Sequence, residues 1–448
     1  MKSMKLTLIK PNIGRREHSL YVDHGRMEPL MLGVLAALTP PDVEVTLHDD
    51  RMESVPFDTP TDLAAITVET YTARRAYEIA AEYRARGVPV ILGGMHVTLL
   101  PEEAAEHADS IFIGDAETLW PQVIADARVG RLRARYQAPP GVAQLPNILP
   151  RRDIFRDKGY LPVSLMQFSR GCRFACHFCA VSQYFGRQYH LRRIDEVVRE
   201  IVEQKLRFVF FVDDNIASDP EGLKALCREL IPLRIHWVSQ ASLDAARDPE
   251  LMRLLADSGC IGNVIGFESI TADSLRDAKK SPNLPGFTDY QREIDALRAH
   301  GMQTWASFTL GYDHDTRESI LATERFARRQ RFTFGAFNIL MPYPNTPLYR
   351  KLARENRLLY DGKWWLHPAY RFNHAAFTPQ RMSAEELTDA CHEARVRFNS
   401  AASLLYRFSD LQTNMRTLWR MAMYWRYTTL FRREVYLKHG MRFGLKSS

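Results

Sequence analysis

The sequence lacks several features that mark common classes of protein. No stretch approaches the roughly 18 consecutive apolar residues that a membrane-spanning helix needs. The apolar run near the start is too short for a secretory signal and predicts a first β-strand instead. Tandem repeats and low-complexity segments are also missing. With 46% hydrophobic and 25% charged residues the composition is typical of a soluble globular protein, and the length of 448 residues predicts two or three domains. We expect the protein to be cytoplasmic.

Signals for binding nucleotides and nucleic acids are equally scarce. No Gly-x-Gly-x-x-Gly pattern is present, so a dinucleotide site has no support. The formal charge of +7 resides in residues 401–448, which contain nine Lys or Arg and two Asp or Glu, and the rest of the chain is neutral. A neutral body without a visible RNA-binding module argues against a nucleic-acid partner.

Cysteine is rare and unevenly distributed. Cys172, Cys176 and Cys179 fall within eight residues, whereas the other three cysteines lie far apart. This pattern favours a metal site plus isolated buried thiols over a disulfide framework. The isolated cysteines are Cys227, Cys260 and Cys391.

Three clustered thiolates can hold three irons of a four-iron cluster and leave the fourth iron open to a substrate or cofactor. One alternative is a structural zinc site, although zinc usually takes four ligands from two Cys-x-x-Cys-like pairs and no second pair is present. A second alternative is three buried structural cysteines, which the tight spacing after Gly171 disfavours.

The first third of the chain alternates strand-like and helix-like segments. This alternation predicts a doubly wound, Rossmann-like parallel sheet, whose ligands bind at the carboxyl ends of the strands. The predicted strands are Leu6–Ile9, Val43–Leu47, Leu63–Val68, Val88–Leu92 and Ser110–Ile113. The predicted helices are Pro29–Leu38, Ala73–Arg86, Glu102–His107 and Glu117–Ala127.

The second region repeats a strand-then-helix unit six times, which predicts a partial (β/α)6 barrel with its chemistry at the carboxyl ends of the strands. The predicted strands are Val163–Phe168, Phe208–Val212, Ile235–Gln240, Asn263–Phe267, Thr304–Leu310 and Phe334–Leu340. A proline-rich linker precedes the barrel, and a helical extension with a basic aromatic tail follows it. The predicted domains are 1–136, a linker over 137–158, the barrel over 159–347 and the extension over 348–448.

The segment Ser169-Arg-Gly-Cys172-x-x-x-Cys176-x-x-Cys179, with an aromatic residue before the last cysteine, resembles the signature of the radical S-adenosylmethionine (SAM) enzymes. The resemblance implies that the three cysteines bind a [4Fe-4S] cluster whose unique iron is chelated by SAM. It also implies reductive cleavage of SAM to a 5′-deoxyadenosyl radical, with a reducing partner such as flavodoxin or ferredoxin.

Polar residues and a glycine at other strand ends fit the same resemblance. Asp214 ends the second barrel strand, where a polar group could hold the amino group of SAM. Glu268 and Ser269 end the fourth strand, where Glu268 could contact the ribose hydroxyls or the methionine amine. Gly311 ends the fifth strand and resembles the glycine that lies along the adenine in this family. The alternative for each is a polar cap or a turn at a strand end.

The segment Gly93-Gly94-Met-His96, which continues to Ala104 and is followed by Ile113–Glu117, is similar to cobalamin-binding-type domains fused to radical SAM barrels. The segment Pro29–Leu38 shows the same similarity. The resemblance implies a corrin held between the edge of the sheet and the barrel mouth. Gly93 and Gly94 permit close approach of a flat ligand, but they could equally form a simple turn. His96 is either a contact to the corrin or a loop cap. The Asp-x-His-x-x-Gly motif of cobalamin mutases is absent, which argues against a cobalt ligated by a histidine.

The extension resembles that of the hopanoid-methylase-like and magnesium-protoporphyrin-cyclase-like branches. We therefore expect cobalamin-dependent methylation of an unactivated carbon in a bulky apolar metabolite, such as an isoprenoid lipid or a natural-product intermediate. Radical cyclisation, rearrangement or oxidation without methyl transfer is the second hypothesis, and a non-enzymatic metal-binding scaffold is the third. The segment Trp419–Arg433 mixes aromatic residues with arginines. It is either an amphipathic helix packed on the body or a helix peripheral to the inner face of an anionic membrane.

Overall fold

The computed structural model describes residues 3–14, 26–139, 147–186, 188–284 and 290–445. These residues form two compact units. The first contains Met1–Pro162, Lys363–Phe372 and Met441–Ser448, and the second contains Val163–Gly362 and Asn373–Gly440. The domain boundaries drawn from the sequence stay predictions, and residues 140–146 of the predicted linker lie outside the described residues.

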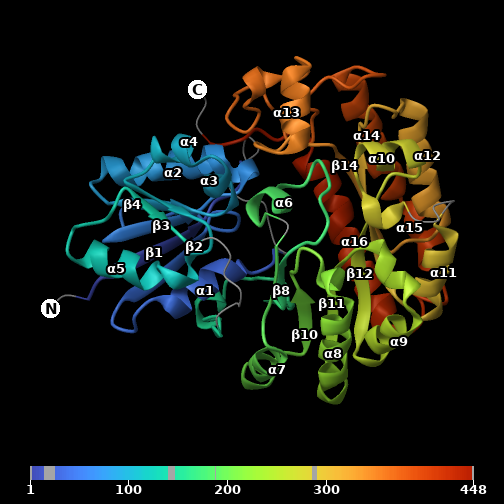
Figure 1. Ribbon diagram of the computed structural model, residues 1–448, viewed down its shortest axis with the longest axis horizontal. Helices are drawn as coiled ribbons and strands as arrows, with labels where there is room; N and C mark the ends of the chain where they lie inside the picture. Colours follow the sequence, from blue (N-terminus) through green and yellow to red (C-terminus); the bar gives the residue numbers. More distant parts are fainter. Residues whose placement is uncertain (1–2, 15–25, 140–146, 187, 285–289, 446–448) are drawn as a thin grey trace. The chain divides into compact units, whose positions relative to one another are not determined.

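The first unit is built on a six-stranded sheet with the order β2-β1-β3-β4-β5-β6, in which all neighbouring strands are parallel (Figure 1). The strands are β1 (Lys5–Lys10), β2 (Glu44–Asp49), β3 (Leu63–Thr67), β4 (Val90–Gly93), β5 (Ser110–Ile113) and β6 (Arg135–Gln137). The strand order reverses direction at β1, as in a doubly wound fold, so the predicted parallel sheet is confirmed. The three-residue strand β6 was not predicted from the sequence.

Helices cover both faces of this sheet. On one face α1 (Leu30–Leu38) and α5 (Trp120–Arg128) share a core with alternate strand residues such as Leu6 and Leu8. The helix α2 (Ala73–Ala85) contacts β3 and β4 and buries Ala76, Ile79 and Ala80. Two short helices, α3 (Met95–Leu99) and α4 (Pro101–Ala105), follow β4.

Two segments from the C-terminal third of the chain complete the first unit. Aromatic side chains of both segments surround Tyr71, whose ring lies 5.0 Å from that of Trp364, 5.5 Å from that of Phe372 and 6.0 Å from that of Phe443. Isolated β-bridges join Arg371 to Arg442 and Gly14 to Gly444. The C-terminal region therefore contributes to the cores of both units.

The second unit contains a six-stranded parallel sheet with the order β14-β13-β12-β11-β10-β7. Sequential strand order with helical crossovers is the pattern of a partial βα-barrel, and the predicted α/β class is confirmed. The strands are β7 (Ser164–Met166), β10 (Phe208–Phe211), β11 (His236–Ala241), β12 (Cys260–Glu268), β13 (Gln303–Leu310) and β14 (Phe334–Ile339). A small antiparallel pair, β8 (Ser169–Gly171) and β9 (Tyr189–Leu191), accompanies the sheet.

The outer face of this second sheet is apolar. Side chains such as Val209, Phe211 and Trp237 pack there against the first barrel helices in a buried core. The helices of this part are α6 (Ala180–Tyr184), α7 (Ile194–Glu203), α8 (Pro220–Leu230), α9 (Pro249–Asp257), α10 (Ala272–Asp277), α11 (Gln291–Ala299) and α12 (Arg317–Arg329).

The predicted extension is helical and packs on the barrel sheet. Its helices are α13 (Pro347–Arg354), α14 (Ala384–Phe398), α15 (Ala401–Phe408) and α16 (Leu418–Lys438). Phe431 of α16 lies 4.6 Å from the ring of Trp305 and 5.1 Å from that of Phe334, so α16 lies beside β13 and β14 (Figure 1). In the described ranges, no helix combines the length and the apolar character that crossing a membrane requires.

Candidate active site

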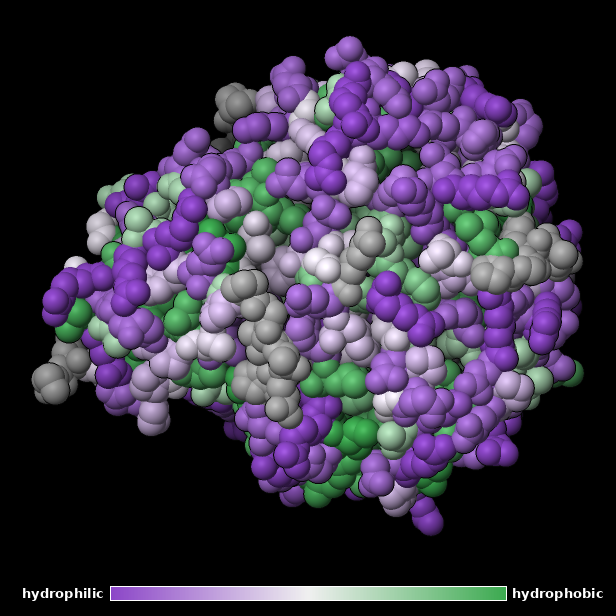
Figure 2. All heavy atoms as spheres, viewed as in Figure 1, coloured by the Kyte–Doolittle hydropathy of each residue, from purple (hydrophilic) through white to green (hydrophobic). Residues whose placement is uncertain are grey.

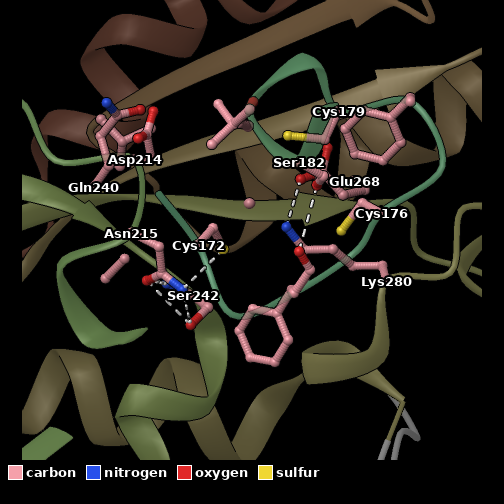
Figure 3. Close-up of a pocket in the computed structure, with 17 residues that line it drawn as sticks. Cys172, Cys176, Cys179, Ser182, Asp214, Asn215, Gln240, Ser242, Glu268 and Lys280 are labelled. Carbon is pink, nitrogen blue, oxygen red and sulfur yellow. Dashed lines mark hydrogen bonds and ion pairs between the residues drawn. The ribbon is translucent and has the colours of Figure 1, made fainter. Parts of the chain in front are cut away.

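The second unit contains a cavity of about 190 Å³ at the carboxyl ends of its strands. It lies on the inner face of the sheet, because Val264 of β12 and Ser307 of β13 line it while their neighbours Ile265 and Ala306 are buried. The polar side chains and thiols that line it are Cys172, Cys176, Cys179, Ser182, Asp214, Asn215, Gln240, Ser242, Glu268, Lys280 and Ser307 (Figure 3).

All three clustered cysteines line this cavity, as Figure 3 shows. Burial raises the pKa of Cys176 to about 12 and also raises the pKa of Cys179, so both are thiols without a metal nearby. Within the part of the chain that the structure describes, no three His, Cys, Asp or Glu side chains converge on a single metal ion. The three sulfur atoms can instead surround a larger polynuclear group.

Two consecutive carboxylates at the end of β10 hold the start of the cysteine loop. Asp213 is fully buried, accepts hydrogen bonds from the backbone N–H and hydroxyl of Ser169, and accepts another from Phe168 N at 3.2 Å. Burial raises the pKa of Asp213 to about 7. Asp214 accepts a hydrogen bond from Gly171 N at 2.8 Å while its side chain lines the cavity. The two consecutive acids thus provide the hydrogen-bond acceptors for the backbone N–H groups at the start of the loop.

The backbone conformation at position 171 requires glycine. Its φ of 87° lies in the left-handed region, and a Cβ atom at this position would lie 2.0 Å from the carbonyl oxygen of Gln188. This close approach allows β8 to pair with β9 directly before Cys172. Further along, His177 donates its N–H to the carbonyl of Ala278 at 3.0 Å, which anchors the middle of the loop.

Asn215 connects the cysteine loop to the next strand. Its side-chain amide lies 3.7 Å from Cys172 Sγ and donates to Ser242 Oγ at 3.1 Å. Its carbonyl accepts a hydrogen bond from Ser242 N at 3.0 Å. An amide donor directed at a ligand sulfur stabilises negative charge on that sulfur, which is one way in which a protein adjusts a cluster's potential.

Glu268 reaches the cavity because the end of β12 is irregular. The pairing of β12 with β13 shifts register between Gly266 and Glu268, and Glu268 has a φ of 62°. A bulge of this kind redirects a side chain, and a left-handed non-glycine residue stores backbone strain. Thr309 donates to Glu268 Oε2 at 2.7 Å and Lys280 donates to Glu268 Oε1 at 2.9 Å.

Lys280 is the main site residue that sequence reasoning missed. Burial lowers the pKa of Lys280, but the Glu268 carboxylate and the negative charge that Cys176 and Cys179 carry as thiolates raise it by more, so the ammonium stays charged. A Cβ atom on Gly266 would lie 2.7 Å from Lys280 Nζ and 2.4 Å from Glu268 Oε1, so glycine leaves room for this pair. The Lys279-Lys280 dipeptide carries no signal that distinguishes it from a surface lysine pair.

Ser269 and Gly311 are not among the described residues that line the cavity. Ser269 Oγ lies 3.2 Å from Thr271 Oγ1. Gly311 N donates to Asp315 Oδ2 at 2.8 Å, and a Cβ atom on Gly311 would lie 2.7 Å from Leu387 Cδ2. Both residues shape the strand ends behind the cavity, and their contact with SAM stays a prediction.

The predicted site of the first unit lies where β4 ends. His96 is completely buried, with Nδ1 at 3.3 Å from Thr70 Oγ1 and Nε2 at 3.1 Å from Glu103 Oε1. Glu103 also accepts from Trp365 Nε1 at 2.9 Å and pairs with Lys363 at 3.2 Å. Burial raises the pKa of Glu103, but the hydrogen bonds from His96 and Trp365 lower it by more, to about 2. Both ring nitrogens of His96 are thus engaged within the protein.

The two glycines beside His96 leave this strand end without side chains. Gly94 has a φ of 109°, and a Cβ atom on it would lie 2.9 Å from Val68 O, so its own fold requires glycine here. A Cβ atom on Gly93 would meet only ordinary contacts, the nearest at 3.5 Å from Phe112 Cβ. Gly114, at the end of β5, also has a positive φ, of 84°. Three glycines at adjacent strand ends fit the close approach of a large flat ligand.

Comparisons with known proteins agree with this arrangement. Residues 166–327 match the model of the radical SAM superfamily. The chain is 29% identical over 399 residues to a bacteriochlorophyllide d C-12(1)-methyltransferase of Chlorobaculum tepidum, with 86% of this chain and 85% of that protein covered. It is 30% identical over 367 residues to the C-8(2)-methyltransferase of the same organism, with 76% and 80% covered.

A solved structure shares the fold. It is the cobalamin-dependent SAM radical enzyme OxsB with aqua-cobalamin bound, which matches 96% of this chain and 72% of its own at a TM-score of 0.64 and 13% identity. Fold, cavity and sequence together define an α/β enzyme of the radical type. The chain belongs to the radical SAM superfamily. Membership implies a [4Fe-4S] cluster and SAM as cofactors, together with a reductant and a small-molecule substrate.

Proposed function

We propose that this protein methylates an unactivated carbon by radical SAM chemistry that depends on cobalamin. The observation that carries the proposal is the similarity to two methyltransferases over at least 80% of their lengths, in a chain whose three clustered cysteines line one cavity. When bound, the cluster, SAM and cobalamin supply a 5′-deoxyadenosyl radical and a methyl group.

We assign Cys172, Cys176 and Cys179 as the cluster ligands. The donor set fits, because three thiols on one cavity can bind three irons of a cluster and leave the fourth iron open. Asn215 donates toward the sulfur of Cys172, and the backbone of His177 anchors the loop. The chain thereby holds three ligand atoms in place before a cluster is loaded.

We assign Asp214, Glu268 and Lys280 to the binding of SAM. The carboxylates of Asp214 and Glu268 can bind the ammonium group of SAM, and the ammonium of Lys280 can bind its carboxylate. All three side chains lie beside the cysteines. Glu268 is held on both oxygens by Thr309 and Lys280, so its position is determined before SAM arrives. Ser269 and Gly311 support the strand ends around this pair.

We assign the glycine-lined strand ends of the first unit, with Gly93 and Gly94, to cobalamin. OxsB, whose fold is similar, binds cobalamin. The engagement of both nitrogens of His96 supports a positioning role for this residue at the strand end, rather than ligation of cobalt. Residues 1–136 would then form the cobalamin-binding-type domain.

The proposed substrate is a bulky, largely apolar metabolite, and a tetrapyrrole is the first candidate because the two curated relatives act on bacteriochlorophyllides. In the proposed reaction a substrate C–H bond breaks and its hydrogen atom passes to the 5′-deoxyadenosyl radical, which gives 5′-deoxyadenosine, while the cleaved SAM leaves as methionine. A C–CH3 bond forms as the S–CH3 bond of a second SAM molecule breaks and leaves S-adenosylhomocysteine. An external reductant such as flavodoxin or ferredoxin supplies one electron for each SAM consumed.

The test is turnover of anaerobically purified protein, reconstituted with iron, sulfide and cobalamin, with SAM labelled in its methyl group. A chlorophyllide-type tetrapyrrole and an isoprenoid lipid are offered as substrates. We expect 5′-deoxyadenosine and a product that carries the labelled methyl group. Formation of 5′-deoxyadenosine with an altered but unlabelled product would reject methyl transfer in favour of cyclisation or rearrangement. Stoichiometric zinc and no SAM cleavage would reject the radical assignment altogether.

A further inference from the structure

Large exposed apolar side chains gather where α15 ends and α16 begins. We call this region the α15–α16 corner and define it as residues 405–419. Leu411 is 73% exposed and Leu418 is 83% exposed, and the corner's other exposed apolar residues are Leu405, Tyr406 and Trp419. The face drawn in Figure 2 is mostly hydrophilic, with apolar side chains in scattered patches. A run of five exposed apolar residues in one short segment therefore indicates an interaction surface.

Most of the remainder of α16 is less exposed, although Tyr436 near its end is 44% exposed. Tyr424 and Thr428 are buried, and Phe431 packs against Trp305 and Phe334. Through these residues the helix packs its apolar side on the barrel. This packing does not account for the exposed apolar residues of its first turn. The predicted packing of the tail helix on the body thus accounts for most of α16, whereas no residue that the structure describes covers the exposed apolar side chains of the corner.

The corner lies at the amino-terminal ends of the barrel strands. The ring of Trp419 stacks on that of His236 at 4.8 Å and lies 5.9 Å from that of Phe208, and these two residues open β11 and β10. Arg420, the next residue, donates to the carbonyl of Gly301, just before β13. Because the strands are parallel, their carboxyl ends with the cavity lie at the opposite edge. The corner is therefore separate from the active site.

Basic side chains surround the corner. Arg207 is exposed directly before Phe208, Arg234 is exposed two residues before His236, and Arg416 is exposed within the corner. For these three arginines no ion pair occurs within the described ranges of the chain. The guanidinium of Arg331 lies 4.9 Å from the ring centre of Tyr406. The single acid of the corner, Asp410, is already paired with Arg298 at 3.2 Å.

We propose that the α15–α16 corner docks on an anionic membrane surface. Leu411 and Leu418 enter the boundary between headgroups and acyl chains, where apolar side chains are favoured, while Trp419 stays stacked on His236 at the edge of the corner. The surrounding arginines bind anionic headgroups. A second copy of the chain is a poorer fit, because a two-fold contact would set this basic surface against itself. Docking at this edge leaves the opposite strand edge, with the cavity, directed away from the lipid.

The proposal is tested by co-sedimentation of the full-length protein with vesicles. We expect binding to vesicles that contain phosphatidylglycerol, weak binding to pure phosphatidylcholine, and loss of binding as salt is raised from about 0.1 M to about 1 M. The double variant Leu411→Ser/Leu418→Ser should bind the anionic vesicles at least about tenfold more weakly. Val129→Ser is the matched control, because Val129 is an exposed apolar residue outside the corner and is 58% exposed.

Charge is tested separately with Arg207→Glu/Arg234→Glu, which should weaken binding to anionic vesicles and leave the circular dichroism spectrum unchanged. Equal binding by wild-type protein and the leucine double variant, or no binding by the wild type, would overturn the proposal. A wild-type dimer that the leucine double variant converts to a monomer would also overturn it and assign the corner to a second copy. Neither vesicle binding nor the oligomeric state is measured by turnover. A negative result for membrane docking therefore leaves the proposed function intact.

Discussion

Lys280 Nζ lies 2.9 Å from Glu268 Oε1, inside the cavity that the clustered cysteines line. The two side chains are 13% and 8% exposed, so neither charge is well solvated without the other. Such a pair is costly to break by removing one partner, because the remaining charge stays buried. This pair therefore sets both the electrostatics of the cavity and the position of the glutamate.

The first prediction concerns this pair. Lys280→Met should weaken SAM binding by about tenfold or more, because Glu268 loses the donor that orients it. Equilibrium dialysis of anaerobically loaded protein measures this effect, and iron content should be unchanged. Lys279→Met, at the exposed neighbouring position, is the matched control. If Lys280→Met bound SAM normally but lost its iron, the lysine would serve the cluster rather than SAM.

The second prediction concerns the cysteines. Cys176→Ala should reduce iron from about four atoms per chain to below about one after anaerobic reconstitution, because two thiolates do not retain the cluster. Iron analysis and the visible absorption of the cluster report the result. Cys391→Ala, which removes a buried thiol from α14, should keep the full iron content. Equal iron in both variants would refute the ligand assignment.

The third prediction concerns acid stability of the first unit. The pKa of Glu103 is about 2 in the folded protein and about 4.5 ordinarily, so the unfolded state binds more protons between these values. The resulting stabilisation is present above pH 4.5 and is lost as the pH falls toward 2. Allowing for solvent screening, it amounts to about 2 kcal/mol. Urea unfolding followed by tryptophan fluorescence should show this loss, and Glu103→Gln should abolish it. An unchanged pH profile in Glu103→Gln would contradict the assignment.

The fourth prediction concerns a stack of histidines in the second unit. The ring of His439 lies 3.9 Å from that of His392 and 5.2 Å from that of His374. Burial, then the neighbouring His392, His374 and Arg395, lowers the pKa of His439 to about 4. The unfolded chain therefore binds more protons between pH 6.5 and 4, and stability falls as the pH falls through this window.

The expected loss is about 1 kcal/mol after solvent screening, and His439→Gln should flatten the unfolding free energy between pH 6.5 and 4. Urea denaturation at a series of pH values measures it. His314→Gln, at an exposed histidine, is the control and should retain the wild-type slope. A wild-type slope in His439→Gln would show that another group carries the acid sensitivity.

Local patterns predicted the regular elements well. The apolar runs of β5 and β13 and the amphipathic α11 lie where the sequence placed them, within a residue at each end. The three-residue strands β6, β8 and β9 were missed, because so short a segment has no detectable period. The inward direction of Glu268 was also beyond local reasoning, since it depends on a register shift between two strands.

The sequence by itself determined the cysteine cluster, the two parallel sheets and the glycine-rich strand ends, because each follows from residue spacing or from the order of strand-like and helix-like segments along the chain. Only the tertiary structure decided which groups meet. Trp365 donates to Glu103 across 262 residues of chain, and Lys280 meets Glu268 across a helix and a turn. Such pairs arise from the packing of whole elements, and a lysine or tryptophan carries no local mark of its distant partner.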